Sequence, residues 1–376
     1  MKYYNFVNAT IIGGLKYLGI HWPLPNLDIL LPIGISFYTF MAVGYVVDVY
    51  RGNAKAESNF GIYALFISFF PQVTSGPIGR INQLIPQLKT PQILSYNNVM
   101  IGLKQILWGY FMKLCIADRL AIYVNAVFDN LEQHNGVTIF ISSIFYSIQI
   151  YCDFAGYSLL AIGTARVMGI HLLENFRRPY FSQSVKEFWS RWHISLSTWF
   201  RDYVYIPLGG NRVSQFRHLL NLMITFIVSG LWHGANWTFI IWGMIHGTFQ
   251  IIETLCKRYI TFKIYIPSIV KILITFLSVN FAWIFFRASN IHNASIAFVK
   301  IFTDFGDPFI NVTVFVMGIA SLAILIIKEF CEEYRIHMKI FQPIKAFYSH
   351  SIIAFLIIYI LLFGVLDGGQ FIYFQF

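Results

Sequence analysis

The chain carries at residues Leu219–Ile252 the stretch LLNLMITFIVSGLWHGANWTFIIWGMIHGTFQII, in which no Lys, Arg, Asp or Glu occurs. A single helix of these 34 residues would be about 50 Å long, well beyond the ~30 Å hydrocarbon core of a bilayer. Two complete spans would need about 40 residues and a turn. The polar break Trp232-His233-Gly234-Ala235-Asn236 near the middle therefore predicts two shortened helices that meet at Gly234-Ala235-Asn236.

Such a turn places His233 at or below the membrane interface, where an ionisable group is a functional-site hypothesis by default. An imidazole in a low-dielectric site stays uncharged near pH 7, which suits it to act as a general base. The structural alternative is a buried histidine that hydrogen bonds locally to Asn236. For His246, which follows one turn after Trp242, a role in helix packing is the stronger interpretation.

The composition indicates a polytopic membrane protein with an all-α fold. Of 376 residues, 57% are hydrophobic and only 12% are charged, against about 25% charged in an average soluble protein, and the mean hydropathy is +0.62. At ~20 residues per span, the apolar runs predict roughly eight to ten membrane segments, some of them re-entrant. No internal repeat divides the sequence, so residues 1–376 are expected to form a single transmembrane domain.

The net charge of +10 is spread over the loops between the apolar runs. A nucleic-acid-binding protein would concentrate this charge in one stripe with a recognition motif, so nucleic acid is not an expected partner. Basic cytoplasmic loops explain the charge better and predict a multi-pass protein of the cytoplasmic (inner) membrane, with the lipid bilayer as its surroundings. The connection Asp129–Gly136 has no Lys or Arg and is expected outside. With Arg217 and Lys257 cytoplasmic, the His233 turn points toward the external side.

Residues Ser184–Tyr203 are predicted to form one amphipathic helix of about five turns at the membrane interface. Aromatic and aliphatic residues recur on one face at helical spacing, and charged and hydroxyl residues take the other. Ser184 and Glu187 form an S-x-x-E capping box, and Pro207 ends the helix. His193 lies at the border of the aromatic stripe, where a lipid-facing helix gains nothing from an imidazole. It is therefore a candidate to line a site.

Charged residues inside the apolar runs are expected to pair with one another or to face a polar tunnel. They are Lys104, Lys113, Asp118, Arg119, Asp153 and Arg166. A second broken element is predicted at Gln72–Arg80, which ends an apolar run too short to span a bilayer and is typical of a re-entrant segment. The sequence has no Cys/His metal spacing, no serine elbow and no phosphate-binding glycine loop, so neither a metal site nor a bound cofactor is expected.

Two long motifs carry a resemblance to the membrane-bound O-acyltransferase family. They are EFWSRWHISLSTWFRDY at Glu187–Tyr203, which continues as YIPLGGNR at Tyr205–Arg212, and GLWHGANW at Gly230–Trp237. Both look most like the alginate O-acetyltransferase branch, in which the second motif contains an invariant histidine. Further matches, which extend the resemblance over nearly the whole chain, are Leu31–Phe40, Ser75–Ile78, Ile116–Asp118, Tyr151–Ser158 and Phe285–Arg287.

This resemblance implies a helical bundle with re-entrant and amphipathic helices around a funnel or tunnel, which joins a cytoplasmic acyl donor to an acceptor on the opposite side. It also implies that His233 is the catalytic residue and that His193 is a second active-site histidine. Members of the family usually carry several more apolar helices before the segment that matches Lys2–Phe6, so this chain is expected to be shortened at its N-terminus.

The leading hypothesis is a membrane O-acetyltransferase that moves an acetyl group from a cytoplasmic thioester toward hydroxyls of an extracellular or periplasmic polysaccharide, as in alginate-type O-acetylation. The donor co-substrate is acetyl-CoA or a carrier-protein thioester. The acceptor is the polysaccharide itself or a periplasmic partner protein that relays the acetyl group. In this hypothesis His233 is the general base, and His193 binds or polarises the thioester carbonyl.

Five further residues are expected to bind substrate. Arg191, Arg201 and Asp202 would organise the cytoplasmic opening for the donor, and Trp232 and Asn236 flank His233. Two alternatives remain. Within the same family, the chain would be a D-alanyltransferase acting on teichoic acid. In another class, it would be a membrane transporter or a non-catalytic scaffold of a polysaccharide-export complex.

Overall fold

The structure, a computed structural model, describes residues 3–20, 25, 27, 34–73, 76–259, 265–335 and 346–367. Lys2, residues 31–33 and residues 74–75, which belong to segments named above, lie outside the described residues. The described part of the chain is helical and contains no β-strand, which confirms the all-α prediction.

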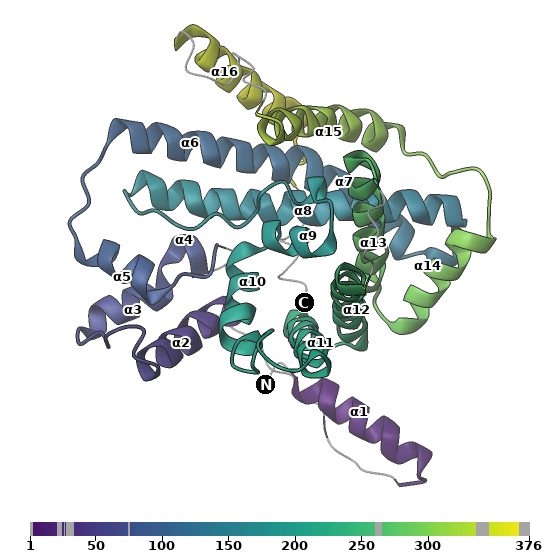
Figure 1. Cartoon of the computed structure of the whole chain (residues 1–376). Helices are drawn as coiled ribbons and strands as arrows, with labels where there is room; N and C mark the ends of the chain where they lie inside the picture. Colours follow the sequence, from purple (N-terminus) through teal and green to yellow (C-terminus); the bar gives the residue numbers. More distant parts are fainter. Residues whose placement is uncertain are drawn as a thin grey trace.

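Figure 1 shows how the helices are arranged along and around the bundle. In chain order they are α1 (Tyr4–Tyr17), α2 (Ile35–Tyr50), α3 (Phe60–Ser68), α4 (Phe70–Val73), α5 (Ile81–Lys89), α6 (Tyr96–Tyr110), the π-helix η1 (Phe111–Ala117), α7 (Asp118–Phe128), the 3₁₀ turn η2 (Leu131–Gln133), α8 (Gly136–Val167), the 3₁₀ turn η3 (Pro179–Phe181), α9 (Val185–Arg191), α10 (Ile194–Phe200), the π-helix η4 (Arg201–Tyr205), α11 (Gln215–His233), α12 (Trp237–Tyr259), α13 (Ser268–Arg287), α14 (Ile291–Thr303), α15 (Val312–Glu333) and α16 (Ala346–Phe363).

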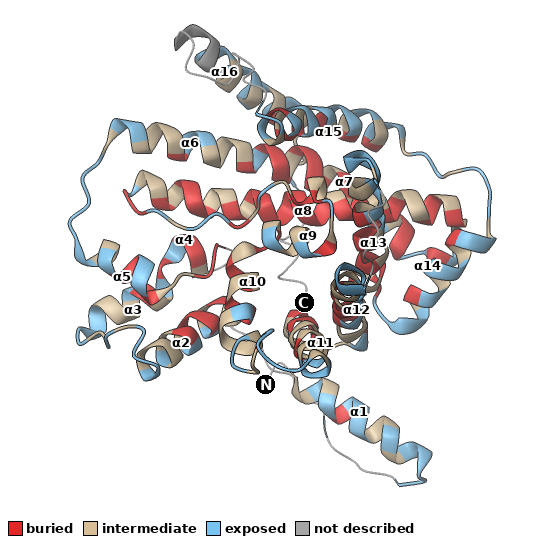
Figure 2. Cartoon of the chain, in the orientation of Figure 1, coloured by how far each residue is buried: buried red, intermediate tan, exposed pale blue. Residues whose placement is uncertain are grey.

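Helix α8 lies at the centre of the fold. Its most apolar window is 67% buried, against 33–39% for the other long apolar helices, and Figure 2 shows buried residues along its length. Helix α6 runs beside it at glycine contacts: a Cβ on Gly102 would lie 2.6 Å from the carbonyl oxygen of Gly163, and one on Gly109 would lie 2.7 Å from that of Gly156. Small residues let helix backbones approach closely, which is a common way to pack helices in membranes.

Three of the charges inside the apolar runs are paired with one another, as predicted. Lys113 of η1 lies with its Nζ 2.7 Å from an oxygen of Asp118 and 2.7 Å from an oxygen of Asp153, and all three side chains are buried. Arg119 donates to the carbonyl oxygen of Phe363 at 2.8 Å. These charges hold helices together, so the internal ion pairing expected for the apolar runs is confirmed for Lys113.

Five of the described helical segments are long and apolar enough to cross a membrane. They are Tyr96–Phe128, Gly136–Val167, Trp237–Tyr259, Ser268–Arg287 and Val312–Glu333. This number is smaller than the eight to ten segments that the apolar runs suggest, because some runs form helices too short to cross a bilayer, such as α2. The run at Phe60–Val73, for example, forms α3 and α4, and the chain then continues through the buried, non-helical residues Gly76–Ile78 to α5.

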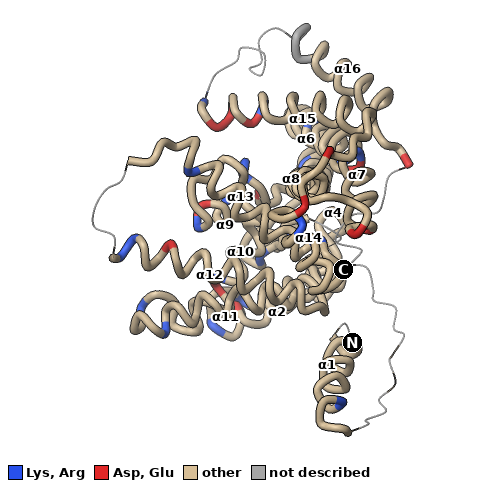
Figure 3. The backbone as a smooth tube through the Cα atoms, turned by 90° about the vertical axis from the view of Figure 1, so that its right-hand side faces the viewer, with Lys and Arg blue, Asp and Glu red and all other residues tan. Residues whose placement is uncertain are grey.

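The predicted hairpin around His233 is confirmed, but its second helix is not shortened: α12 continues past the charge-free run to 23 residues, enough to cross a membrane. Helix α11 ends at His233, α12 begins at Trp237, and the two cross at glycines: a Cβ on Gly230 would lie 2.2 Å from the carbonyl oxygen of Phe239. Apart from Arg217, the charged residues of this hairpin belong to the last two turns of α12. In Figure 3 the charges of α11 and α12 accordingly lie toward one end of the hairpin.

The prediction of one continuous amphipathic helix over Ser184–Tyr203 is wrong. The Ser184 side chain caps α9 by accepting a hydrogen bond from the Glu187 amide at 3.1 Å, as predicted, but α9 ends at Arg191. His193 then has a left-handed backbone conformation (φ 41°, ψ 55°) and α10 starts at the next residue. An L-residue adopts this conformation only when contacts elsewhere in the fold hold it there, and such contacts are invisible in helical periodicity.

We predict that Gly230→Ala destabilises the protein, since the added methyl group meets backbone atoms of α12 that cannot move alone. Overpacking of this kind typically costs about 1–3 kcal/mol. Gly14→Ala in α1 is the matched control, because nothing lies within 4 Å of a Cβ there and the exchange favours a helix. Thermal unfolding in detergent measures both. Equal melting temperatures for Gly230→Ala and the unsubstituted protein would contradict the close crossing.

Candidate functional site

The two histidines singled out by the sequence both lie next to one indole. The ring centroid of Trp232 is 4.7 Å from that of His233 and 6.3 Å from that of His193. His233 comes from the end of α11 and His193 from the break between α9 and α10, 40 positions apart in sequence. The tertiary structure therefore brings both predicted catalytic residues into one place.

His233 is almost completely buried, with 4% of its surface exposed. Besides Trp232, its ring contacts Trp242 of α12 and Phe286 of α13, with centroids 5.0 and 5.1 Å away in edge-to-face geometry. Three aromatic rings from three helices thus fix the plane of this imidazole. A group held so firmly in a dry environment is pre-organised for proton transfer at a defined position.

His193 is also buried, with 1% exposed, and its ring lies edge-to-face against Phe154 of α8 at 4.5 Å. Neither ring nitrogen has a hydrogen-bond partner among the described residues. Burial lowers the pKa of this imidazole from 6.5 to about 3, so the ring is neutral at physiological pH and carries one N–H donor and one acceptor. Buried polar atoms are normally satisfied, so two open nitrogens point to a bound group or water at this position.

A third histidine, His246, belongs to the same cluster, although its sequence pattern indicates only helix packing. It is fully buried, its Nδ1 accepts a hydrogen bond from the indole of Trp189 at 3.3 Å, and its ring lies 4.9 Å from that of Trp242. Since Trp242 also contacts His233, the three histidines share a continuous set of aromatic rings. No sequence signal reveals this, because Trp189 is 57 positions from His246.

A cavity of about 450 Å³ adjoins this cluster, between α9, α10 and η4 on one side and α11 and α12 on the other. Trp189, the partner of His246, forms part of its wall, and so does Ser229, one helical turn before His233. Lys186 and Arg201 line it as well. The basic residues that begin α11 and end α12 predict, by the positive-inside rule, that this end of the hairpin faces the cytoplasm. The remaining lining is largely apolar, which suits a thioester with a charged headgroup.

The predicted donor-binding residues separate into two groups. Arg201 lies at the cavity and is paired with Asp202 at 2.8 Å, while Asp202 also accepts from Arg80 at 3.0 Å. The side chain of Arg201 is 59% exposed, so it is accessible to an anionic ligand. Tyr203 extends this group by donating to Asp48 at 2.6 Å.

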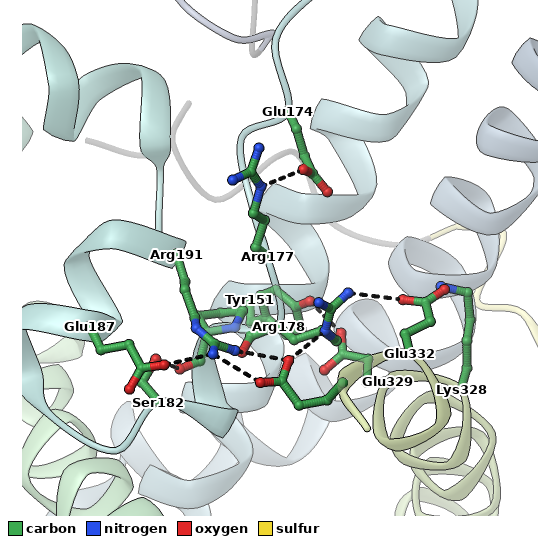
Figure 4. A network of polar contacts seen from close by, with 12 residues as sticks. Tyr151, Glu174, Arg177, Arg178, Ser182, Glu187, Arg191, Lys328, Glu329 and Glu332 are labelled. Atoms are coloured by element: carbon green, nitrogen blue, oxygen red, sulfur yellow. Dashed lines mark hydrogen bonds and ion pairs between the residues drawn. The ribbon is translucent and has the colours of Figure 1, made fainter. Parts of the chain in front are cut away.

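Arg191 lies in the other group, between a carboxylate of its own helix and one of α15. Its guanidinium forms two 2.9 Å hydrogen bonds with Glu333 at the end of α15 and a 2.6 Å bond with Glu187. Figure 4 shows that Arg178 joins the same network, and Glu333 accepts from it at 2.8 Å. Arg191 therefore ties α9 to α15, and direct contact with a substrate stays a prediction for this residue.

Trp232 and Asn236 flank the hairpin turn between α11 and α12. Trp232 is half-buried and contacts both site histidines. Asn236 starts α12, since its side chain accepts from the Thr238 amide at 3.1 Å and donates to the carbonyl oxygen of Ser289 at 2.8 Å. This asparagine fixes the turn, and substrate contact likewise stays a prediction for it.

Comparison with known proteins gives a consistent picture. The model of the membrane-bound O-acyltransferase family matches residues 54–292. The chain is 40% identical over 306 residues to a probable alginate O-acetylase of Pseudomonas syringae pv. tomato, which covers 81% of the chain and 58% of that protein. It is 36% identical to a peptidoglycan O-acetyltransferase of Helicobacter pylori over 76% of the chain and 61% of that protein.

A teichoic acid D-alanyltransferase of Bacillus subtilis is a more distant relative, 29% identical over 77% of the chain and 79% of that protein. The chain spans about three fifths of the length of the curated alginate O-acetylases that it matches. All seven residues expected at the site, which are Arg191, His193, Arg201, Asp202, Trp232, His233 and Asn236, fall within the part that the family model matches.

We predict that Trp189→Phe destabilises the protein, since it leaves the buried Nδ1 of His246 without its donor. Such an orphaned group costs about 1–3 kcal/mol, and replacement of both partners by apolar rings should recover much of the loss. Chemical or thermal unfolding of Trp189→Phe, His246→Phe and the double variant measures this coupling. If the loss of unfolding free energy in the double variant equals the sum of the two single losses, the hydrogen bond does not exist.

Proposed function

The chain belongs to the membrane-bound O-acyltransferase family, and from this we propose that it is an O-acetyltransferase acting on an extracellular or periplasmic polysaccharide. The donor is a cytoplasmic acetyl thioester. The observation that supports this best is the position of His193 and His233 against one indole, next to a cavity with basic residues at its opening. A multi-pass helical protein with such a site suits transfer between the two sides of a membrane.

The proposed chemistry is attack of a hydroxyl oxygen on a thioester carbonyl. His233 takes the proton of the hydroxyl as the new C–O bond forms, the C–S bond breaks, and the released thiolate takes up this proton from His233. The surrounding rings of Trp232, Trp242 and Phe286 exclude water, which would otherwise hydrolyse the thioester. The neutral imidazole of His193 donates one N–H to the carbonyl oxygen, where negative charge develops.

The cavity beside Trp189 is proposed to receive the thioester donor. Lys186 and Arg201 are suited to hold an anionic headgroup, either of acetyl-CoA or of a carrier-bound thioester. The acceptor would reach His233 from the opposite, external side of the hairpin. Acceptor hydroxyls belong either to the polysaccharide or to a periplasmic partner protein that relays the acetyl group.

We predict that His233→Ala lowers acetyl transfer by the purified, reconstituted chain about 10²- to 10⁴-fold, which is the usual contribution of a general base. His292→Ala, an exposed histidine of α14, is the control and should leave the rate unchanged. Transfer of labelled acetyl from a thioester to acceptor is the measurement. Survival of transfer within threefold in His233→Ala would exclude this residue as the base.

We also predict that Thr225→Trp, which places a large ring in the cavity, raises the KM for the thioester donor at least about tenfold, or ~1.4 kcal/mol. Val228→Trp on the same helix is the control, since residue 228 is 38% exposed and does not line the cavity. Donor-dependent initial rates of both variants test this. If the two variants have the same KM, the donor binds elsewhere.

Two other functions predict different chemical groups on the surface of cells that carry this protein, or none at all. D-alanyl transfer to teichoic acid, the activity named for the Bacillus subtilis relative, would leave D-alanyl rather than acetyl esters on the surface polymer. Mild alkaline release followed by mass analysis separates the two groups. A transporter would change solute uptake without changing surface esters. A scaffold would leave esters intact in His233→Ala cells and remove them on deletion of the gene.

A further inference from the structure

The left-handed backbone of His193 needs an explanation within the fold. This conformation is uncommon for any residue other than glycine, and it is maintained only where surrounding contacts impose it. It affects where the imidazole points, because His193 lies in the break between α9 and α10. Whatever holds the turn therefore also holds the active-site position of His193.

The two residues after His193 are both bound to Asn175. The Ile194 amide donates to the backbone oxygen of Asn175 at 2.9 Å. The Ser195 amide and the Ser195 hydroxyl donate to the side-chain Oδ1 of Asn175 at 3.2 and 2.9 Å. On the other side of the turn, the Arg177 amide donates to the carbonyl oxygen of Arg191 at 2.9 Å. The segment around Asn175 thus binds the chain before and after His193.

Asn175 is itself fixed from two directions. It is 1% exposed, and its side-chain nitrogen donates to the hydroxyl of Ser158 on α8 at 3.2 Å. The Ser195 hydroxyl in turn accepts from the amide of Ile78, in the non-helical segment before α5, at 3.0 Å. One carboxamide therefore connects α8, the segment after α8, α10 and the predicted re-entrant segment. Only a side chain with both a donor and an acceptor can make these bonds.

The same segment also holds the imidazole ring. Phe176, next to Asn175, lies parallel to His193 at a centroid distance of 6.4 Å, and Phe154, one turn before Ser158, lies edge-on at 4.5 Å. Backbone and ring of His193 are consequently held by neighbouring residues of one segment and one helix. A shift of Asn175 would therefore displace both the backbone and the ring of His193.

We infer that Asn175 is the positioning residue of the site: it imposes the left-handed turn that aims His193 at the reacting carbonyl. This inference rests on the proposed O-acyltransferase function. Asn175 lies behind the turn and acts on the reaction through His193. Asn175 carries no signal in the sequence, because it is a lone asparagine after an apolar helix.

The matched control is Asn280, a second buried asparagine that bridges serines of α8. It is 0% exposed, donates to Ser143 at 3.0 Å and accepts from Ser147 at 2.7 Å, but it belongs to α13 and has no bond to the His193 turn. Asn175→Ala and Asn280→Ala therefore remove a similar number of buried hydrogen bonds. They differ in whether His193 is affected.

In the acetyl-transfer assay with the full chain, we expect Asn175→Ala to lower kcat at least about tenfold with the donor KM changed less than about twofold, the pattern of a lost transition-state interaction. Asn280→Ala should leave kcat per folded protein within about twofold. In a His193→Ala background, Asn175→Ala should lower kcat by less than about a further twofold, since it acts through that histidine. If Asn175→Ala and Asn280→Ala lower kcat equally, or if the losses at 175 and 193 multiply, the inference is wrong.

Thermal unfolding tests the turn without any assumption about activity. Glycine adopts the left-handed conformation freely, so a turn with His193→Gly should depend less on the hydrogen bonds of Asn175. Asn175→Ala should therefore lower the Tm less in that background than in the unsubstituted chain. Ser195→Ala, which keeps the amide bond to Asn175 and loses the hydroxyl link, is the milder variant should Asn175→Ala not fold, and the same coupling is expected for it. Equal Tm losses in both backgrounds would overturn the inference. If the Tm losses differ between the two backgrounds but the unsubstituted chain transfers no acetyl group, the role of Asn175 in the turn is supported. The proposed function is then refuted.

Discussion

Lys113 lies inside the helix bundle between the carboxylates of Asp118 and Asp153, and the arrangement of the other helices depends on this group. A charge away from water is costly unless an opposite charge is at hand, so the segment α6–η1–α7 and the helix α8 have to keep one alignment. The glycine contacts between α6 and α8 support the same alignment. Because α8 is the most buried long helix, this alignment sets the frame in which the rest of the chain packs.

The site is built on that frame. Along one side of α8, Tyr151 forms a hydrogen bond with Glu329 of α15, Phe154 packs against His193, and Ser158 binds Asn175. The network of arginines and carboxylates in Figure 4 ties the segment after α8 to the end of α15, next to these contacts. Neither site histidine belongs to α8, yet the position of His193 is set from it, and His233 reaches the same indole because α11 and α12 cross closely at glycines.

Several features of the fold could be predicted from the sequence because they depend on local pattern. A charge-free run of known length with a polar break predicts a hairpin. Ser184 and Glu187 predict the start of a helix, and charges in an apolar run predict an ion pair. The helix over Ser184–Tyr203 was predicted as continuous, since periodicity reports which residues share a face and is blind to a turn imposed from outside. His246 was undervalued for the same reason, as its partner Trp189 lies on another element.

By itself, the sequence determined the class of the protein, the hairpin whose first helix ends at His233 and, through long motifs that resemble a family, the identity of both candidate histidines. Hydrophobicity, spacing and residue type are properties of the chain that need no partner to exist. Only the tertiary structure decided that both histidines lie against Trp232, that Arg201 lies at the cavity while Arg191 binds Glu333, and that Asn175 holds the His193 turn. These relations join residues far apart in sequence, and their energies arise from contacts that form only when the helices have packed.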